Sequence, residues 1–174
     1  MNSAEQQATR RIVKWMIISA CLLGIAMVLL LFNHFLEKEL NPTPSLYSRT
    51  GEFGQTEVVL QRNRYGHYVS NGQINGYTVQ FMLDTGATDV AIPEKLANKL
   101  SLSKGTEKRY ITANGTVTAY STMLDSVSIG PIVIPNVRAS INPGLKGNQI
   151  LLGMSVLKRI EFTQRGDTLI LRAP

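Results

Sequence analysis

The chain has 174 residues, a formal net charge of +6 and one cysteine. This length allows one ordinary domain and an appendage. The single Cys21 excludes an intrachain disulfide and a multi-cysteine zinc site, and the two histidines, His34 and His67, are too few and too far apart for a histidine metal centre or a catalytic triad. The Lys and Arg residues are scattered, with no interleaved aromatic platform, so we expect no nucleic-acid binding. We also expect no metal and no cofactor.

An uncharged apolar run occupies the N-terminal part of the chain, from Trp15 to Phe32. As a helix it spans roughly 27 Å, about the thickness of the hydrocarbon core of a bilayer. A cleaved signal peptide is the alternative, but this run is too long for one, and no small-x-small cleavage site follows it. We therefore expect an uncleaved transmembrane helix over residues 12–36.

The charges that flank this run predict its orientation. Three cations lie between residues 10 and 14, whereas the charges of residues 37–39 nearly cancel. The positive-inside rule then places residues 1–11 in the cytoplasm and the C-terminal part outside the inner (cytoplasmic) membrane, in the periplasm of a Gram-negative cell.

A linker is expected over residues 37–56. Two prolines, two glycines and several small polar residues lie between Asn41 and Thr56, and this composition suits a spacer.

Many short apolar stretches separated by turn signals follow, and they predict a small all-β barrel over residues 57–174. Asn75-Gly76 suits a type I′ turn between two of the strands. Pro93 is well placed to open a short helix, 94–100, and a second short helix is expected over 154–159. The expected strands are 57–62, 67–74, 77–83, 90–92, 108–112, 116–123, 124–129, 132–141, 149–152, 160–162 and 168–171.

The strand Tyr77–Leu83 delivers a carboxylate, Asp84, into a tight turn of small residues, Thr85-Gly86-Ala87. Burial disfavours the charged form of a lone carboxylate, so its position at the end of a buried strand needs a reason. The simplest reason is that Asp84 accepts backbone N–H groups in the turn.

The run Phe81–Asp89, followed downstream by Ile150-Leu151-Leu152-Gly153, resembles the active-site turn and the second motif of the retropepsin-like aspartic proteases. The resemblance covers roughly residues 57 to 172 and is greatest to membrane-anchored bacterial members. It implies a small closed barrel, preceded here by the transmembrane helix. It also implies that Asp84, Thr85 and Gly86 are catalytic residues.

The same resemblance implies where a peptide substrate binds. Ala87, Thr88 and Asp89 fall at positions that contact the peptide main chain in the family, although turn capping is the alternative for Thr88 and Asp89. The hairpin 108–123 falls where the family has its flap, and an ordinary surface hairpin is the alternative. Its tip comprises Ala113, Asn114 and Gly115, which we also expect to contact substrate.

The chain carries one Asp-Thr-Gly and no Asp-Ser-Gly, so it supplies half of such a site. Two carboxylates that share one proton can activate a water molecule and protonate a peptide carbonyl. We therefore expect a homodimer in which two Asp84 side chains meet across a two-fold axis. Two other interpretations of the barrel remain open: a non-catalytic module that binds peptides by strand addition, and a structural domain of the cell envelope.

Overall fold

The structure is a computed structural model of the chain, and it describes residues 3–43, 47–51, 54–112 and 115–173. The chain divides into two compact units, residues 1–39 and residues 40–174. Each unit is described by itself below.

One long helix, α1 (Ser3–Leu40), forms the first unit up to residue 39, and its last residue, Leu40, belongs to the second unit. Its segment Arg10–Asn33 contains an 18-residue window with a mean hydropathy of 2.6, and its apolar side chains are exposed. A helix that is apolar on every face is not the amphipathic surface helix of a globular domain. The length and composition of this segment suit a membrane span, and they equally suit a signal sequence.

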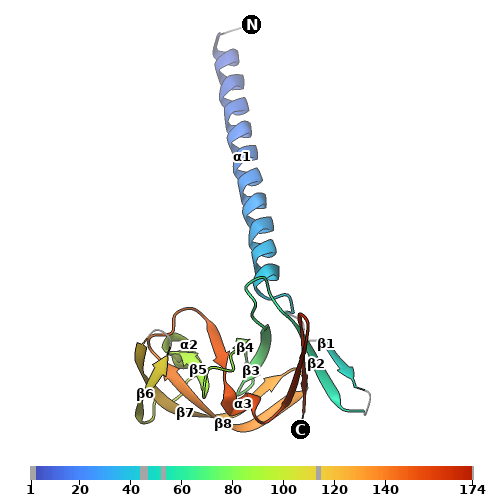
Figure 1. The fold of residues 1–174 in the computed structure, drawn as a ribbon. Coiled ribbons are helices and arrows are strands. Elements are labelled where there is room, and N and C mark those ends of the chain that lie inside the picture. Colours follow the sequence, from blue (N-terminus) through green and yellow to red (C-terminus); the bar gives the residue numbers. More distant parts are fainter. Residues whose placement is uncertain (1–2, 44–46, 52–53, 113–114, 174) are drawn as a thin grey trace. The chain divides into compact units, whose positions relative to one another are not determined.

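The second unit is a β structure with two short helices (Figure 1). The short helices are α2 (Glu94–Lys99) and α3 (Met154–Leu157). The strands are β1 (Tyr47–Thr50), β2 (Thr56–Gln61), β3 (Val69–Ile74), β4 (Tyr77–Leu83), β5 (Val90–Pro93), β6 (Glu107–Thr112), β7 (Gly115–Ile129), β8 (Ile132–Asn142), β9 (Gln149–Leu152), β10 (Glu161–Arg165) and β11 (Thr168–Arg172).

Seven of the strands form the larger sheet, in the order β3-β4-β9-β5-β8-β7-β6. A further pairing between β3 and β7 closes six of them into a ring, from which β6 extends. The ring encloses the core, whose largest fully buried side chains include Phe81, Ile92, Leu124 and Leu152. The expected all-β barrel with short helices is confirmed.

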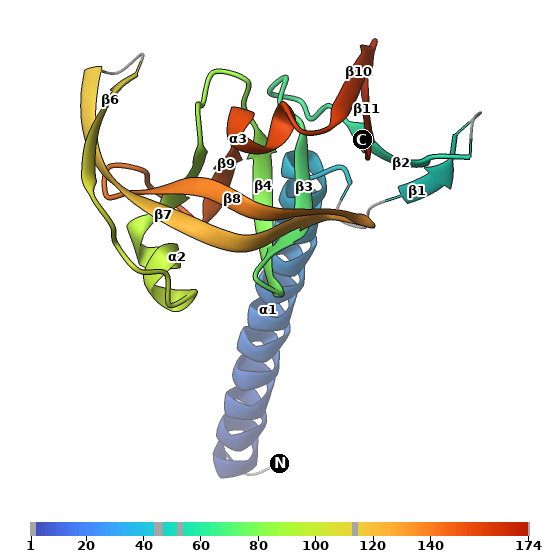
Figure 2. The ribbon, with the colours of Figure 1, turned by 90° about the horizontal axis from the view of Figure 1, so that it is seen from below.

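The hairpin β3–β4 turns at Asn75-Gly76, as the sequence predicts. Both residues have positive φ, 49° and 82°, which a type I′ turn requires. By contrast, the expected strands 116–123 and 124–129 are one continuous strand, β7, because no Gly or Pro interrupts it between Gly115 and Gly130. Figure 2 shows β7 and β8 running side by side across the unit. The second short helix, α3, is also shorter than expected, since it ends at Leu157.

The remaining four strands form a separate sheet in the order β1-β2-β11-β10. The strand β1 lies within residues 37–56 and was not anticipated, because the prolines and glycines around it dominate the sequence signal. Residues just before it also contact the unit: Thr43 Oγ1 accepts the backbone N–H of Gln61 at 3.0 Å, and Asn63 Nδ2 donates to the Leu40 carbonyl at 3.0 Å. Part of the expected linker is therefore ordered structure.

Glu57 on β2 joins three strands of this sheet. Its carboxylate is buried, with 4% of the side chain exposed, and it accepts hydrogen bonds from Arg49 Nε on β1 at 2.8 Å and from Arg172 Nε on β11 at 2.7 Å. These residues stand directly opposite Glu57 in the register. The hydrogen bond from Arg172, and then that from Arg49, lowers the pKa of Glu57 below its ordinary value.

Candidate active site

Asp84 lies immediately after β4, where the chain leaves the barrel wall and turns. Its backbone N–H donates to the Leu152 carbonyl on β9 at 3.1 Å, and its own carbonyl accepts the N–H of Ala87 at 3.2 Å. The parallel pairing of β4 with β9 sets this position, since Leu83 stands opposite Leu152. The two motifs that carried the family resemblance are thus adjacent in space.

The Asp84 carboxylate is partly exposed, so water reaches it. Its Oδ1 accepts the backbone N–H of Gly86 at 2.9 Å, which is the turn-capping role that the residue type suggested. No hydrogen bond from the described residues reaches its Oδ2. One carboxylate oxygen is therefore held by the turn, and the other is available to a ligand or to a second carboxylate.

Thr85 and Gly86 are both exposed at the apex of the turn. A Cβ at Gly86 would lie 3.2 Å from Asp84 Oδ1, which is closer than ordinary van der Waals contact. Glycine therefore leaves the carboxylate undisturbed and keeps the apex open to an approaching backbone.

The far side of the turn is held by the start of α3. The backbone N–H groups of Met154 and Ser155 donate to the carbonyls of Ala87 and Thr88, at 2.8 and 2.9 Å. Gly153 makes this approach possible, because a Cβ there would lie 2.6 Å from the Ala87 carbonyl oxygen. The requirement for glycine is steric, since its backbone is extended (φ −90°, ψ −172°).

Ser155 adds a side-chain link between three segments and was not identified from the sequence. Its buried hydroxyl accepts the N–H of Val90 at 3.1 Å and donates to the Arg138 carbonyl on β8 at 2.8 Å. It therefore fixes the end of the turn at residues 84–89, the candidate active-site turn, to β8. The only sequence signal was its position two residues after Gly153.

Asp89 closes the turn, and 12% of its side chain is exposed. The hydroxyl of Tyr110, on β6, donates to Asp89 Oδ2 at 3.3 Å. The buried Oδ1 lies 3.5 Å from Arg138 Nη2, an ion pair without hydrogen-bond geometry. Burial, followed by the negative charge of Asp89, raises the pKa of Tyr110 above its ordinary value. Tyr110 and Arg138 were not predicted as site residues.

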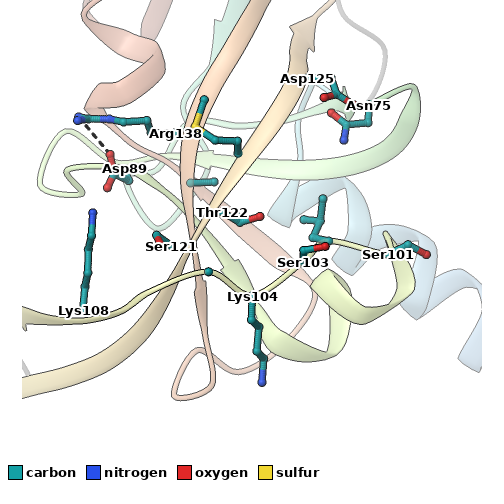
Figure 3. A pocket seen from close by; sticks show the side chains of 14 residues that line it. Asn75, Asp89, Ser101, Ser103, Lys104, Lys108, Ser121, Thr122, Asp125 and Arg138 are labelled. Carbon is teal, nitrogen blue, oxygen red and sulfur yellow. Dashed lines mark ion pairs between the residues drawn. The ribbon is translucent and has the colours of Figure 1, made fainter.

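A pocket of about 630 Å³ lies beside Asp89 (Figure 3). Its walls come from β7, β8 and the segment 101–105, and they do not include Asp84. Figure 3 shows Lys108 and Arg138 extending toward the Asp89 carboxylate, so two cations face one anion at this end of the pocket. In the described part of the chain, no three His, Cys, Asp or Glu side chains are grouped to hold a metal ion.

The hairpin β6–β7 is the segment expected to act as a flap. Residues 107–112 pair with residues 115–120, and Ile111 near the tip is 92% exposed. Gly115 is exposed with φ +104°. Ala113 and Asn114, the other expected tip residues, lie outside the described residues. Tyr110 connects this hairpin to the end of the active-site turn through Asp89.

Comparison with known proteins places these features in a family. Residues 70–159 match the family model described as gag-polyprotein putative aspartyl protease. The fold matches the crystal structure of a retropepsin-like aspartic protease from Rickettsia conorii with a TM-score of 0.59 and 34% identity, covering 74% of this chain and 96% of that one.

Two curated relatives are uncharacterised. One, a Sinorhizobium protein encoded in the cobV 5′ region, is 38% identical over 127 residues, which are 71% of this chain and 54% of that protein. The other, from Rickettsia prowazekii (strain Madrid E), is 38% identical over 120 residues, 66% of this chain and 51% of that protein. The chain thus spans about half the length of the curated relatives it matches. From the family model and the Rickettsia conorii structure together, we conclude that the chain belongs to the retropepsin-like aspartic proteases.

Proposed function

We propose that this protein is a membrane-anchored aspartic endopeptidase whose active form is a homodimer. The observation that carries the proposal is the Asp84 carboxylate, which is partly exposed at an open turn and has one oxygen held by Gly86 N–H and the other oxygen available. Members of this family are proteases, so the family match supports a catalytic role for this carboxylate. Because the chain carries a single Asp-Thr-Gly, a second chain would supply the other carboxylate in this proposal.

In the dimer, Asp84 and Asp84 of the partner subunit hold one proton and one water molecule between them. The ionised carboxylate takes a proton from the water as its oxygen attacks the peptide carbonyl carbon, and the protonated carboxyl gives its proton to the carbonyl oxygen. The resulting gem-diol then collapses: its C–N bond breaks, and the amine leaves with a proton returned through the dyad. The two carboxyls titrate as a pair because like charges about 3 Å apart resist ionising together.

The rest of the turn and the flap bind the substrate. Thr85 holds the two turns together across the dimer, and Gly86 admits the substrate backbone. Ala87, Thr88 and Asp89 bind the peptide main chain, with the hairpin tip at Ala113, Asn114 and Gly115 closing over it. In this proposal Asp89 both binds the peptide and holds the flap, because its carboxylate also accepts a hydrogen bond from the Tyr110 hydroxyl on β6.

The long helix provides the anchor in this proposal. Residues 1–11 form a cytoplasmic tail and residues 12–36 cross the inner membrane. Residues 37–56, which include β1, lead to the protease domain at residues 57–174, and both parts lie in the periplasm. The apolar segment Arg10–Asn33 and the three cations at its N-terminal end support this arrangement. Anchoring confines the chains to two dimensions and raises their effective concentration for dimer formation.

The proposal is tested by replacing the carboxylate in the full chain, reconstituted in detergent micelles and assayed against a fluorogenic peptide library from neutral to acidic pH. We expect Asp84→Asn to lower the cleavage rate by at least about 100-fold, as loss of a general acid–base group does. The control is Asp125→Asn, the same change at an exposed carboxylate on β7. The control should cleave like the wild type.

Thermal unfolding of both variants shows whether the domain remains folded. Full activity of a folded Asp84→Asn variant would refute the catalytic role. A wild-type chain that binds library peptides without cutting them at any pH would instead support the peptide-binding module.

A further inference from the structure

The strand β10 (Glu161–Arg165) is an open edge at the C-terminal end of the fold. Within the described part of the chain it pairs only with β11, and β11 lies between β10 and β2. Both edges of β11 are therefore hydrogen-bonded to strands of the same chain. Among the strands that the structure describes, the edges open to a second copy are β10 and, on the opposite side, β1 (Figure 2).

The sequence of β10, Glu-Phe-Thr-Gln-Arg, complements itself about its centre. In an antiparallel pair of two copies centred on Thr163, Glu161 of each chain stands opposite Arg165 of the partner subunit. Opposite charges in directly facing positions stabilise a strand pair. Within the described residues neither Glu161 nor Arg165 has an ion-pair partner, and both side chains are exposed.

The backbone of β10 suits the same register. The strands β10 and β11 are joined by the two-residue turn Gly166-Asp167, so Arg165 and Thr168 at its ends exchange backbone hydrogen bonds. Along a strand, the backbone N–H and C=O groups of successive residues point alternately to one neighbouring strand and to the other. The groups of Arg165, Thr163 and Glu161 therefore point to β11, and those of Phe162 and Gln164 point to the open edge. A pair centred on Thr163 places Phe162 opposite the partner's Gln164, and these groups then bond to each other.

Phe162 gives the edge an apolar contact. Its side chain is 43% exposed, although it lies on the same face of the sheet as the buried Leu169 and Leu171. In the self-paired register, the two Phe162 rings are diagonal neighbours on that face, within reach of each other. Pairing would thus cover an aromatic side chain that one chain leaves open to water.

The other edge, β1, lacks these features. Its single charged residue, Arg49, is already bonded to the buried Glu57. Two-fold pairing of β1 therefore brings no opposite charges together. By contrast, β10 follows directly after α3, the helix whose first residues hold the active-site turn.

We propose that β10 is the strand through which two copies of this protein associate, in an antiparallel pair centred on Thr163. The inference rests on the proposed homodimer and names its partner surface. A five-residue edge buries little area, so the dimer is weak by itself and depends on membrane confinement.

Disulfide trapping tests the register in the full chain, in a Cys21→Ser background reconstituted in phosphatidylcholine vesicles. Residues that face each other in a non-hydrogen-bonded pair have Cα atoms about 4.5 Å apart, within disulfide range. We expect Thr163→Cys to form a covalent dimer under mild oxidation. The matched control, Ser48→Cys on β1, should remain monomeric.

Charge exchange tests the contacts. In the Thr163→Cys chain, either Glu161→Arg or Arg165→Glu places like charges opposite each other and should lower the dimer yield about fivefold. The double exchange restores opposite charges and should restore the yield. A Thr163→Cys chain that does not cross-link, a Ser48→Cys chain that cross-links equally well, or a double exchange without recovery would overturn the proposal.

The trapping experiment does not depend on catalysis, and Asp84→Asn in the Thr163→Cys chain should cross-link unchanged. A chain that cross-links at β10 but cleaves no peptide refutes the proposed function and retains the interface. A chain that cleaves peptides but does not cross-link at β10 refutes the interface alone.

Discussion

A Cβ atom on Gly153 would lie 2.3 Å from the carbonyl oxygen of Asp89. The start of α3 and the end of the active-site turn therefore touch through their backbones, with no room for a side chain. Backbone atoms on both sides of this contact are fixed by hydrogen bonds, from Met154 to Ala87 and from Ser155 to Thr88. The geometry of the site thus depends on Gly153, although this residue has no side chain that could take part in a reaction.

The first prediction concerns this contact. Gly153→Ala should destabilise the domain by about 1–3 kcal/mol, the usual cost of overpacking, because backbone cannot move aside as a flexible side chain does. Denaturant unfolding of the full chain measures the change. The control is Gly24→Ala in α1, where an added Cβ meets nothing within 4 Å. Equal stability of the two variants would contradict the steric argument.

The second prediction concerns Ser155. Ser155→Ala leaves the buried N–H of Val90 without its hydroxyl acceptor, and an unsatisfied buried group costs roughly 1–3 kcal/mol. Cleavage should fall as well, because the turn is no longer fixed to β8. The matched control is Ser121→Ala. The Ser121 hydroxyl donates to the Thr106 carbonyl in an exposed position, so its loss should change stability and cleavage little. Similar losses in both variants would show that burial of the hydroxyl is not the cause.

The third prediction concerns the contact between β6 and the turn at residues 84–89. Tyr110→Phe removes the hydroxyl that donates to Asp89 and should cost about 0.5–1.5 kcal/mol, the net value of one hydrogen bond. Amide hydrogen exchange should quicken along β6, since the hairpin loses its side-chain tie. Tyr77→Phe, at a tyrosine that is 60% exposed, serves as the control. Unchanged exchange along β6 would show that the backbone hydrogen bonds to β7 protect this strand without the Tyr110 contact.

The pKa of Tyr110 gives the same contact a pH dependence. This pKa is raised, chiefly by burial and then by the charge of Asp89. A raised pKa in the folded state means that Tyr110 stabilises the fold fully below its ordinary value of 10.0 and loses that contribution as the pH rises through the folded value. The wild type should therefore lose more stability in strong alkali than Tyr110→Phe does.

The fourth prediction concerns acid and the four-stranded sheet. The arginines beside Glu57 lower its pKa, so its contribution to stability is present above the ordinary value of 4.5 and is lost as the pH falls through the folded value. Glu57→Gln should lower the unfolding midpoint at neutral pH, and the difference from wild type should shrink in acid. Glu107→Gln, an exposed carboxylate on β6, should show no such convergence.

The barrel and the turn at residues 84–89 could be predicted because their signals are local. Alternation identified the strand from Tyr77 to Leu83, and Asn75-Gly76 identified the turn before it. The contacts around Asp89 could not be predicted, because Tyr110 and Arg138 come from strands that the fold brings together from distant parts of the chain. Ser155 was missed for the same reason, since its partners lie on β5 and β8.

The strand β1 was missed for a different reason. Its four residues carry little apolar pattern, and what stabilises it is a cross-strand ion pair, Arg49 with Glu57, that no local signal reveals. Its position is therefore set by tertiary contacts rather than by propensity.

If α1 anchors the protein as proposed, the pairing of β1 with β2 bears on its release from the membrane. A proteolytic nick at Gly54-Gln55 would break the covalent tether, yet β1 would stay bonded to β2 along the ladder and Arg49 to Glu57. The severed N-terminal piece would remain attached as a separate peptide. Shedding would then take two steps, the cut and the dissociation of this short strand from β2.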